Sequence, residues 1–385
     1  MKKLLAIAAT LAASSAFAGV KLEVRSDYVN TPAYDNAVGG ENGGSSLFTP
    51  SVARLYLNGT VGEAIVESAW NLRSFSPEVA FNPYTGSADL SKNMTVDSFV
   101  DHLWAGKAMG NWMFKAGKLE VNTGGFERQK NLHGDTYLVS MANGGIGGVI
   151  GNPLAPSVPA IGEVVNPENS SGISAAYSIT ENHKLEAQIT NQVNSQTATG
   201  FDTATPANGF SEKSLDRRHT MGLNYLGSFL DKMLVLNLNY TSGAGDTNVT
   251  GHELEFIAAS LRVNPMADLT FDVEYFGNKD KQTTPGGASA DVKTTSTIIE
   301  ARYNINGWIP VLKYEMSENT GATTATDFKR DAWALGVEYV PKADEAFRYH
   351  VAYTSIKDKD FGAGVEDMTK NMIVVGFKYT GDMAK

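Results

Sequence analysis

The chain has 385 residues, a formal net charge of −10, no cysteine and a charged share of 19%, which is below the usual level of about 25%. The absence of cysteine excludes disulfides and thiolate metal sites. The acidic balance argues against nucleic acid as a partner, because neutralising phosphates requires a basic surface. The six histidines are scattered without an H-x-x-x-H spacing, so neither a metal site nor a cofactor is expected.

The first eighteen residues predict a secretory signal peptide. Residues 1–3 form a short basic head, residues 4–13 are mainly apolar, and Ala16-Phe17-Ala18 provides a small-residue cleavage site. The apolar stretch is too short to remain as a membrane helix, which needs about 20 residues. Cleavage would remove two lysines and change the net charge from −10 to −12. We therefore expect an exported protein with a single domain over residues 19–385.

Beyond residue 18, no apolar run approaches the length of a spanning helix, but apolar and polar residues often alternate at every second position. Residues 269–275 are the clearest case, with Leu, Phe, Val and Tyr on one face and Thr, Asp and Glu on the other. A strand that faces lipid on one side and water on the other requires this alternation. About sixteen such segments are expected, most of them roughly 9–11 residues long. Their spans are 20–28, 51–61, 64–74, 95–106, 112–122, 171–180, 183–195, 217–227, 233–242, 252–263, 268–278, 294–305, 308–318, 330–340, 347–357 and 371–380.

The connections between these segments alternate between long and short. Residues 29–50, 75–94 and 123–170 are long, whereas Gly62-Glu63 and Glu181-Asn182 are tight turns. Long outer loops and short periplasmic turns are typical of a bacterial outer-membrane barrel, and an even strand count places both chain ends in the periplasm. The sequence therefore predicts an all-β fold, a transmembrane antiparallel β-barrel of about 16 strands, with 14 and 18 as alternatives, in the outer-membrane lipid of a Gram-negative cell. A barrel of this size encloses an aqueous channel.

Aromatic residues fall near the ends of the predicted strands. Most tyrosines lie toward strand ends, and two tryptophans open outward-running strands. Because aromatic side chains favour both membrane interfaces, these positions predict two girdles. The girdle residues are Trp112, Tyr177, Tyr225, Tyr240, Tyr275, Tyr303, Trp308, Tyr339, Tyr353 and Tyr379. A soluble β-sandwich would not need two aromatic belts in phase with loop length.

The third long connection, residues 123–170, is far longer than ordinary loops, and loops of this length are usually functional or disordered. Its start carries Glu127, Arg128, Lys130 and Asp135. Two interpretations remain open. The connection could fold into the barrel and place charges at a constriction, or it could be an extracellular loop at a subunit contact. Its low charge after Asp135 favours the first interpretation.

Two segments resemble the porin O/P family, which is named for its phosphate-selective members. They are Arg54-Leu55-Tyr56-Leu57-Asn58-Gly59 and residues 116–127, which read Ala-Gly-Lys-Leu-Glu-Val-Asn-Thr-Gly-Gly-Phe-Glu. That family shows an Arg-and-Leu strand ending in Gly, followed by a hairpin into a Gly-Lys strand that closes on Gly and Glu. The resemblance implies a sixteen-stranded homotrimeric porin with an inward-folded third loop, and not an enzyme.

Charges of both signs fall at positions that face the lumen. The strand candidates for the lumen or constriction are Arg25, Arg54, Lys184, Arg218, Glu300, Arg302, Lys313 and Arg348. Phosphate-selective relatives use an arginine ladder and a lysine cluster, whereas no single-sign ring occurs here, so strong ion selectivity is not expected. The arginines among them could form a wall that faces the third connection, or each could pair with a nearby carboxylate. Lys115 and Lys118 are three positions apart, and successive side chains of a strand point to opposite faces. A regular strand therefore directs only one of the two lysines into the lumen.

These patterns favour passive diffusion of small hydrophilic solutes and ions through a water-filled channel. A substrate- or anion-selective porin is the first alternative. A surface or adhesion protein with the barrel as its anchor is the second, although the loops other than the third are too short for a separate folded domain. An enzyme is not expected, because the nearest Ser/His combination, His350 with Ser355, would lie on opposite faces of one strand.

Overall fold

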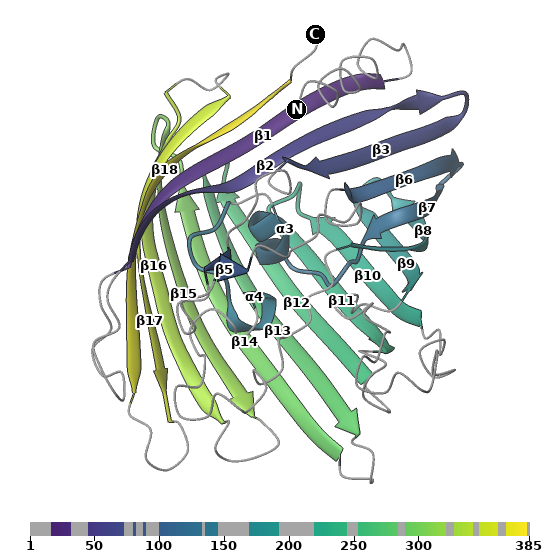
Figure 1. The fold of residues 1–385 in the computed structure, drawn as a ribbon. Helices are drawn as coiled ribbons and strands as arrows, with labels where there is room; N and C mark the ends of the chain where they lie inside the picture. The colour runs from purple at the N-terminus through teal and green to yellow at the C-terminus, as the bar shows by residue number, and fades with distance from the viewer. Residues whose placement is uncertain are drawn as a thin grey trace.

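The computed structural model is a closed antiparallel β-barrel in which sixteen strands pair in chain order and the first pairs with the last (Figure 1). The structure describes residues 17–31, 45–72, 80–81, 88–89, 100–132, 135–144, 169–191, 219–244, 253–283, 289–320, 327–341, 346–360 and 367–382. The barrel strands are β1 (Phe17–Thr31), β2 (Ser45–Val61), β3 (Ala64–Asn71), β6 (Val100–Met109), β7 (Trp112–Glu120), β8 (Asn169–Thr180), β9 (His183–Asn191), β10 (His219–Phe229), β11 (Leu234–Ala244), β12 (Glu253–Met266), β13 (Leu269–Thr283), β14 (Ser289–Tyr303), β15 (Trp308–Thr320), β16 (Phe328–Tyr339), β17 (Phe347–Lys359) and β18 (Met368–Asp382). Among the described residues, no helix has the length and apolarity needed to cross a membrane.

The barrel is apolar outside and polar inside, the reverse of a soluble protein. On β15, Leu312 is 54% exposed on the outer face, whereas the next residue, Lys313, is 2% exposed on the inner face. The same alternation of exposed and buried residues recurs on β13, β16 and β17, where exposed Val, Leu and aromatic side chains alternate with buried residues. The buried residues include polar ones such as Glu274, Glu338 and His350, and on β16 and β17 also apolar ones such as Ala334 and Ile356. A surface of this kind is stable against lipid, and the closed ring leaves no unpaired strand edge in the hydrocarbon.

Each of the sixteen predicted spans overlaps one barrel strand, so the predicted barrel is confirmed. The predicted lengths are wrong for many strands: β2 has 17 residues, and β1, β13, β14 and β18 have 15 each. A tilted strand crosses the hydrocarbon in about 9–11 residues, but hydrogen bonding between neighbours continues beyond the membrane. The second long connection also contains an unpredicted two-stranded sheet of β4 (Ala80–Phe81) and β5 (Ala88–Asp89).

Short links close one rim of the barrel. Gly62 turns between β2 and β3 with φ of 62°, and Asn306-Gly307 turns between β14 and β15 with φ of 51° and 88°. These left-handed conformations suit two-residue hairpins. Lys21 near the start of β1 pairs with Asp382 at the end of β18, so the beginning and the end of the barrel lie at this same rim (Figure 1).

Two irregularities determine which β6 and β7 side chains face inward. The pairing of β3 with β6 shifts between Ala69 and Trp70, which leaves Asp101 as an extra residue in a β-bulge. On β7, Lys115 lies on the lumen side with its Nζ 4.4 Å from the Trp104 ring centre. Lys118 instead donates a hydrogen bond to the carbonyl of Val100 at 2.6 Å. Lys115 is therefore the lumen residue of the two.

Candidate pore constriction

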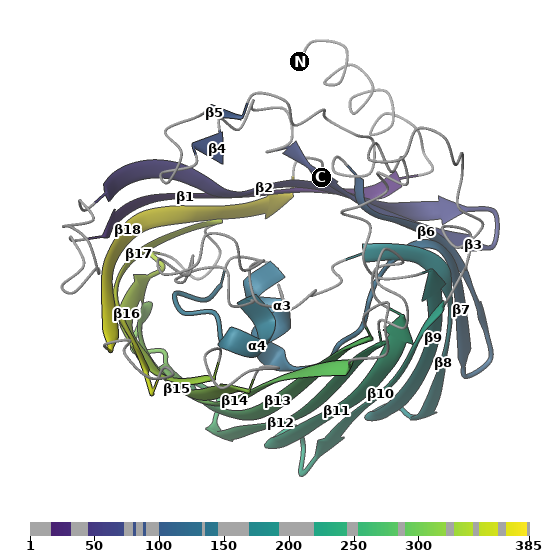
Figure 2. The same cartoon turned by 60° about the horizontal axis from the view of Figure 1, so that its bottom comes forward.

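After β7 the chain turns into the barrel. The described residues 121–132 and 135–144, here called the inner segment, include the short helices α3 (Phe126–Leu132) and α4 (Met141–Gly144). Figure 2 shows both helices inside the ring of strands, beside the wall formed by β13, β14 and β15. α3 contacts β13, and α4 contacts β13 and β14.

The beginning of the inner segment lies along the lumen face of the wall, from β9 to β13. The carbonyl of Asn122 accepts hydrogen bonds from Asn239 Nδ2 at 2.8 Å and Thr241 Oγ1 at 2.9 Å. The Gly124-Gly125 pair follows with φ of 77° and 88°. A Cβ on Gly125 would lie 2.4 Å from the Phe276 ring, so this close approach requires glycine.

Wall side chains cap the starts of both helices. Glu274 accepts hydrogen bonds from the backbone N–H groups of Phe126 and Glu127 at 2.6 and 2.9 Å. Glu315 accepts one from the N–H of Met141 at 2.7 Å. The first N–H groups of a helix have no partner within it, and a negative charge near them is favourable. Wall carboxylates therefore help to hold the inner segment against the barrel.

A fully buried ion pair joins Glu127 of α3 to Lys313 of β15. Glu127 is 0% exposed and Lys313 is 2% exposed. Glu127 also accepts hydrogen bonds from the Ser140 N–H at 2.8 Å and from the Asn143 amide, while Lys313 donates to the Leu138 carbonyl at 2.6 Å. One buried pair thus connects both parts of the inner segment to the wall.

A second set of contacts surrounds Asp135. Its carboxylate accepts hydrogen bonds from Arg348 and from Lys378, the latter at 2.8 Å, and its carbonyl accepts one from Arg302. Arg348 also lies 3.1 Å from Glu338. The inner segment is therefore held by cations from β14, β17 and β18 at this point.

Contacts of two further cations, Lys130 and Arg25, extend the attachment of the inner segment. Lys130 Nζ lies 2.5 Å from Asp272 and 2.7 Å from Glu300. On the opposite side, Arg25 donates to the carbonyl of Thr136 at 3.2 Å and lies 5.2 Å from the Tyr137 ring centre. The inner segment thus joins β13 and β14 to β1 across the lumen face.

The structure brings eight of the twelve candidate residues into this one set of contacts. They are Arg25, Glu127, Lys130, Asp135, Glu300, Arg302, Lys313 and Arg348. Arg54 instead pairs with Asp101 at 2.6 Å, and Lys184 pairs with Glu186 at 2.8 Å. Arg128 is buried, and Arg218 lies outside the described residues. Arg25, Arg302 and Arg348 contact the inner segment directly and also have carboxylate neighbours.

The sequence profile of the family described as phosphate-selective porin O and P matches residues 19–380. The chain belongs to this family. It is an outer-membrane porin channel and not an enzyme. Among curated proteins, no sequence matches it.

Solved porins share the fold of this porin at low sequence identity. OmpT of Vibrio cholerae is 12% identical with a TM-score of 0.57, and the match covers 94% of this chain and 98% of that one. The outer-membrane channel DcaP of Acinetobacter baumannii is 11% identical with a TM-score of 0.60, covering 94% and 96%. An anion-selective porin from Comamonas acidovorans is 14% identical with a TM-score of 0.57, covering 94% and 98%. One of the OmpT structures is described as a trimer form.

Several wall residues that hold the inner segment of this porin were not among the predicted constriction residues. They are Asp272, Glu274, Glu315, Glu338 and Lys378. All of them lie on the lumen face, and the alternation of residues 269–275 already placed Asp272 and Glu274 together on the polar face of their strand. Which lumen charges lie beneath the inner segment depends on its path, and no local pattern encodes that path. Among the described residues, no group of three or more His, Asp or Glu side chains could hold a metal ion.

The aromatic residues of the porin occupy two levels. Near the rim with the short links, the ring centres of Trp112 and Tyr177 lie 4.7 Å apart with their planes tilted, and Trp308 stacks with Tyr339 at 4.4 Å. Tyr225, Tyr303 and Tyr379 lie within the last five residues of their strands. Tyr240 also lies within the last five residues of its strand, β11. Tyr275 and Tyr353 are each the seventh residue of strands with 15 and 13 residues, so they lie nearer the middle of the strand than predicted. The reason is that these strands continue past the apolar band.

We expect the contact at Asp135 to persist in mild acid. Burial raises the pKa of its carboxyl, but Arg348 and Lys378 outweigh burial and hold the pKa below its usual value of 3.8. A carboxyl with a lowered folded-state pKa stabilises the folded contact above the usual pKa and loses this effect as the pH falls through the lowered value. The difference in single-channel conductance between the unsubstituted porin and Asp135→Asn should therefore stay constant from pH 7 to about pH 4 and disappear only below that. Loss of this difference between pH 7 and pH 5 would contradict the assignment.

Proposed function

We propose that this porin is a general diffusion pore for small hydrophilic solutes and ions, narrowed by the inner segment and weakly selective between cations and anions. The pairing of fixed charges inside the barrel supports this proposal. Arg25 lies 2.9 Å from Asp27, Arg302 lies 2.7 Å from Glu300, and Lys378 lies 2.7 Å from Glu23. A lumen whose cations and carboxylates are paired at this distance presents little net field to a passing ion.

Anion selectivity is the second candidate function. The name of the family and the anion-selective porin from Comamonas acidovorans both favour it. Against it, the cations nearest the inner segment are matched by carboxylates, and the sequence contains no single-sign ring. The two candidates differ in the sign and size of the potential that a salt gradient produces.

Reversal potential in a KCl gradient tests this difference. Because the described lumen charges are paired, we expect a cation-to-anion permeability ratio within about threefold of one. Arg54→Gln and Asp101→Asn, made separately on the wall away from the inner segment, should shift the ratio in opposite directions. A strongly anion-selective potential in the unsubstituted porin would favour the second candidate and overturn the first.

The assembly and processing of the porin are also proposals. The trimer form of OmpT supports a homotrimer within the outer-membrane lipid. The start of the family match at residue 19 supports removal of residues 1–18 as a signal peptide, which would shorten β1 by Phe17 and Ala18. The two aromatic levels support contact with both membrane interfaces.

A further inference from the structure

A small apolar patch interrupts the polar lumen face of β16 and β17. Three buried residues form it: Ala332, Ala334 and Ile356. Leu138 of the inner segment packs on this patch and is itself only 2% exposed. Apolar surface inside a water-filled lumen is unfavourable unless another apolar group covers it. The patch, here called the Leu138 seat, therefore adds a packing contact to the ion pairs that hold the inner segment.

The inner face of β16 carries only small residues at the Leu138 seat. Because side chains of a strand alternate between its faces, Ala332, Ala334 and Gly336 are consecutive inner residues. A Cβ on Gly336 would lie 3.3 Å from both Cδ2 and Cε2 of the Tyr137 ring, which is closer than ordinary van der Waals contact. Tyr137 and Leu138 therefore lie close to the backbone of β16, with no large wall side chain beneath them.

Hydrogen bonds hold the same two residues on either side of the seat. Thr354, the register partner of Ala334 on β17, donates from Oγ1 to the Tyr137 carbonyl at 3.1 Å. The Tyr137 hydroxyl donates to Glu338 at 2.9 Å, and the Leu138 carbonyl accepts from Lys313 at 2.6 Å. These bonds fix where the stretch lies along the wall. The side chains packed beneath it determine how far it extends from the wall into the lumen.

The contact of α4 with the wall has the opposite distribution of sizes. There the wall residues Phe276 and Ile298 are large, and the inner residue packed against them is Ala142. At the Leu138 seat the wall residues beneath the leucine are alanines. Close-packed side chains do not interpenetrate. The combined size of the wall and inner side chains therefore sets the distance between the inner segment and the wall at each contact.

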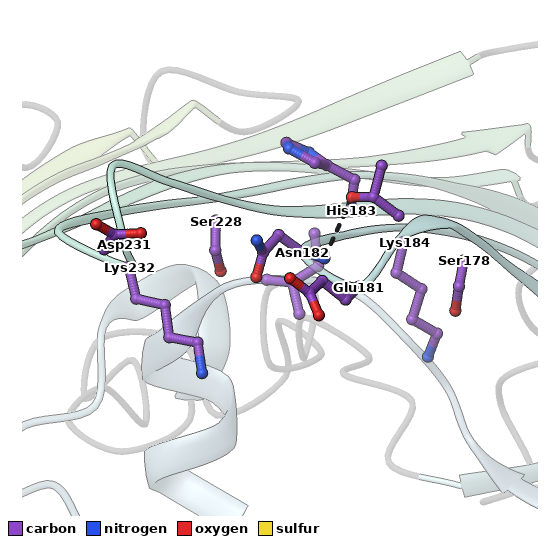
Figure 3. A pocket seen from close by; sticks show the side chains of 10 residues that line it. Ser178, Glu181, Asn182, His183, Lys184, Ser228, Asp231 and Lys232 are labelled. Carbon is purple, nitrogen blue, oxygen red and sulfur yellow. Dashed lines mark hydrogen bonds between the residues drawn. The ribbon is translucent and has the colours of Figure 1, made fainter.

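An open cavity lies on the lumen side of the periplasmic rim of β8–β11. It has a volume of about 710 Å³, and Ser178, Lys184 and Ser228 are among the residues that line it. Figure 3 shows Lys184 and Lys232 on either side of this space. A volume of this size accommodates a small solute. The limit on solute size therefore lies at the inner segment and not at this part of the rim.

We propose that Ala334 and Gly336 are size-determining residues of the pore. Their small size lets Tyr137 and Leu138 lie close to the wall, and this position fixes the free width of the lumen beside the inner segment. The inference rests on the proposed diffusion pore and adds the residues that set its size limit. A larger side chain at either position moves the stretch into the lumen and narrows the pore, the opposite of what loss of an anchoring contact does.

Ala334→Leu tests the Leu138 seat. The single-channel conductance in KCl should fall by at least about a fifth, because an overpacked contact displaces its neighbours. The largest neutral polymer that enters the pore should also become smaller. Adding Leu138→Ala to this variant exchanges the two side chains across the contact and conserves their total volume. The double variant should therefore recover the conductance and the polymer limit of the unsubstituted porin.

Ala301→Leu controls for the added side chain, because it makes the same change on the lipid-facing side of β14, between the exposed Ile299 and Tyr303. Its conductance should equal that of the unsubstituted porin. If Ala334→Leu does not fold, Gly336→Ala should lower the conductance in the same direction by a smaller amount.

Three results would overturn the Leu138 seat as the determinant of width. They are unchanged conductance in a folded Ala334→Leu porin, a fall that Leu138→Ala does not reverse, and an equal fall in the Ala301→Leu control. Absence of KCl conductance in the unsubstituted porin would instead overturn the proposed pore itself.

Discussion

Replacing Lys313 with methionine is expected to detach the inner segment from the wall and to raise the single-channel conductance severalfold. The substitution leaves the Glu127 carboxylate buried without its cation, which costs about 3–5 kcal/mol in comparable buried pairs. It also removes the donor to the Leu138 carbonyl. The sixteen strands keep their backbone hydrogen bonds, so the barrel should still fold. Single-channel recording of the purified variant measures the effect.

Two further variants make this expectation specific. Glu127→Gln in the Lys313→Met background removes the uncompensated charge and should return the conductance toward that of the unsubstituted porin. Lys107→Met is the matched control. This lysine of β6 also pairs with a carboxylate, Glu63 of the neighbouring β2–β3 turn, at 2.5 Å, but both side chains are exposed, and an exposed ion pair contributes about 0–1 kcal/mol. A folded Lys313→Met barrel with unchanged conductance would show that the buried pair does not hold the constriction.

Deleting residues 126–143 and joining the ends with a short Gly-Ser link should produce the largest increase in conductance. The deletion removes α3, most of α4 and the Asp135 and Lys130 contacts, while the barrel ladder from β1 to β18 remains intact. Because the removed residues lie inside the ring of strands (Figure 2), the open cross-section should grow. Conductance and exclusion of neutral polymers of graded size both measure that cross-section.

A deletion of equal length in another long connection, residues 196–213, is the control. It should leave the conductance close to that of the unsubstituted porin if the inner segment determines the width. Unchanged conductance after removal of residues 126–143, with the strands shown to be folded by circular dichroism, would rule out the inner segment as the constriction.

The fold was predictable because the membrane imposes a simple pattern on each strand. On β15, apolar and polar residues alternate from Leu312 to Ser317, and only one face of such a strand can meet lipid. The strand ends were less predictable. β13 continues through Lys279-Asp280-Lys281 to Thr283, where cross-strand pairing persists but the alternation required by lipid has ended.

The candidate site was predictable in part. The alternation of apolar and polar residues along their strands placed Arg302, Lys313 and Arg348 on the lumen face. The length of the third connection indicated a functional segment. The pairing of Glu127 with Lys313 joins residues 186 positions apart, and no local signal encodes it. Glu274 was missed because its role is to cap a helix of the inner segment, which only the three-dimensional path reveals.

Conductance of the purified porin in planar lipid bilayers tests the central claim most directly. A water-filled pore predicts stepwise current increases in KCl and steps of similar size in a salt of bulky ions of equal bulk conductivity. Protein that inserts with its strands folded and yet produces no conductance steps would contradict the account of this chain as an open channel.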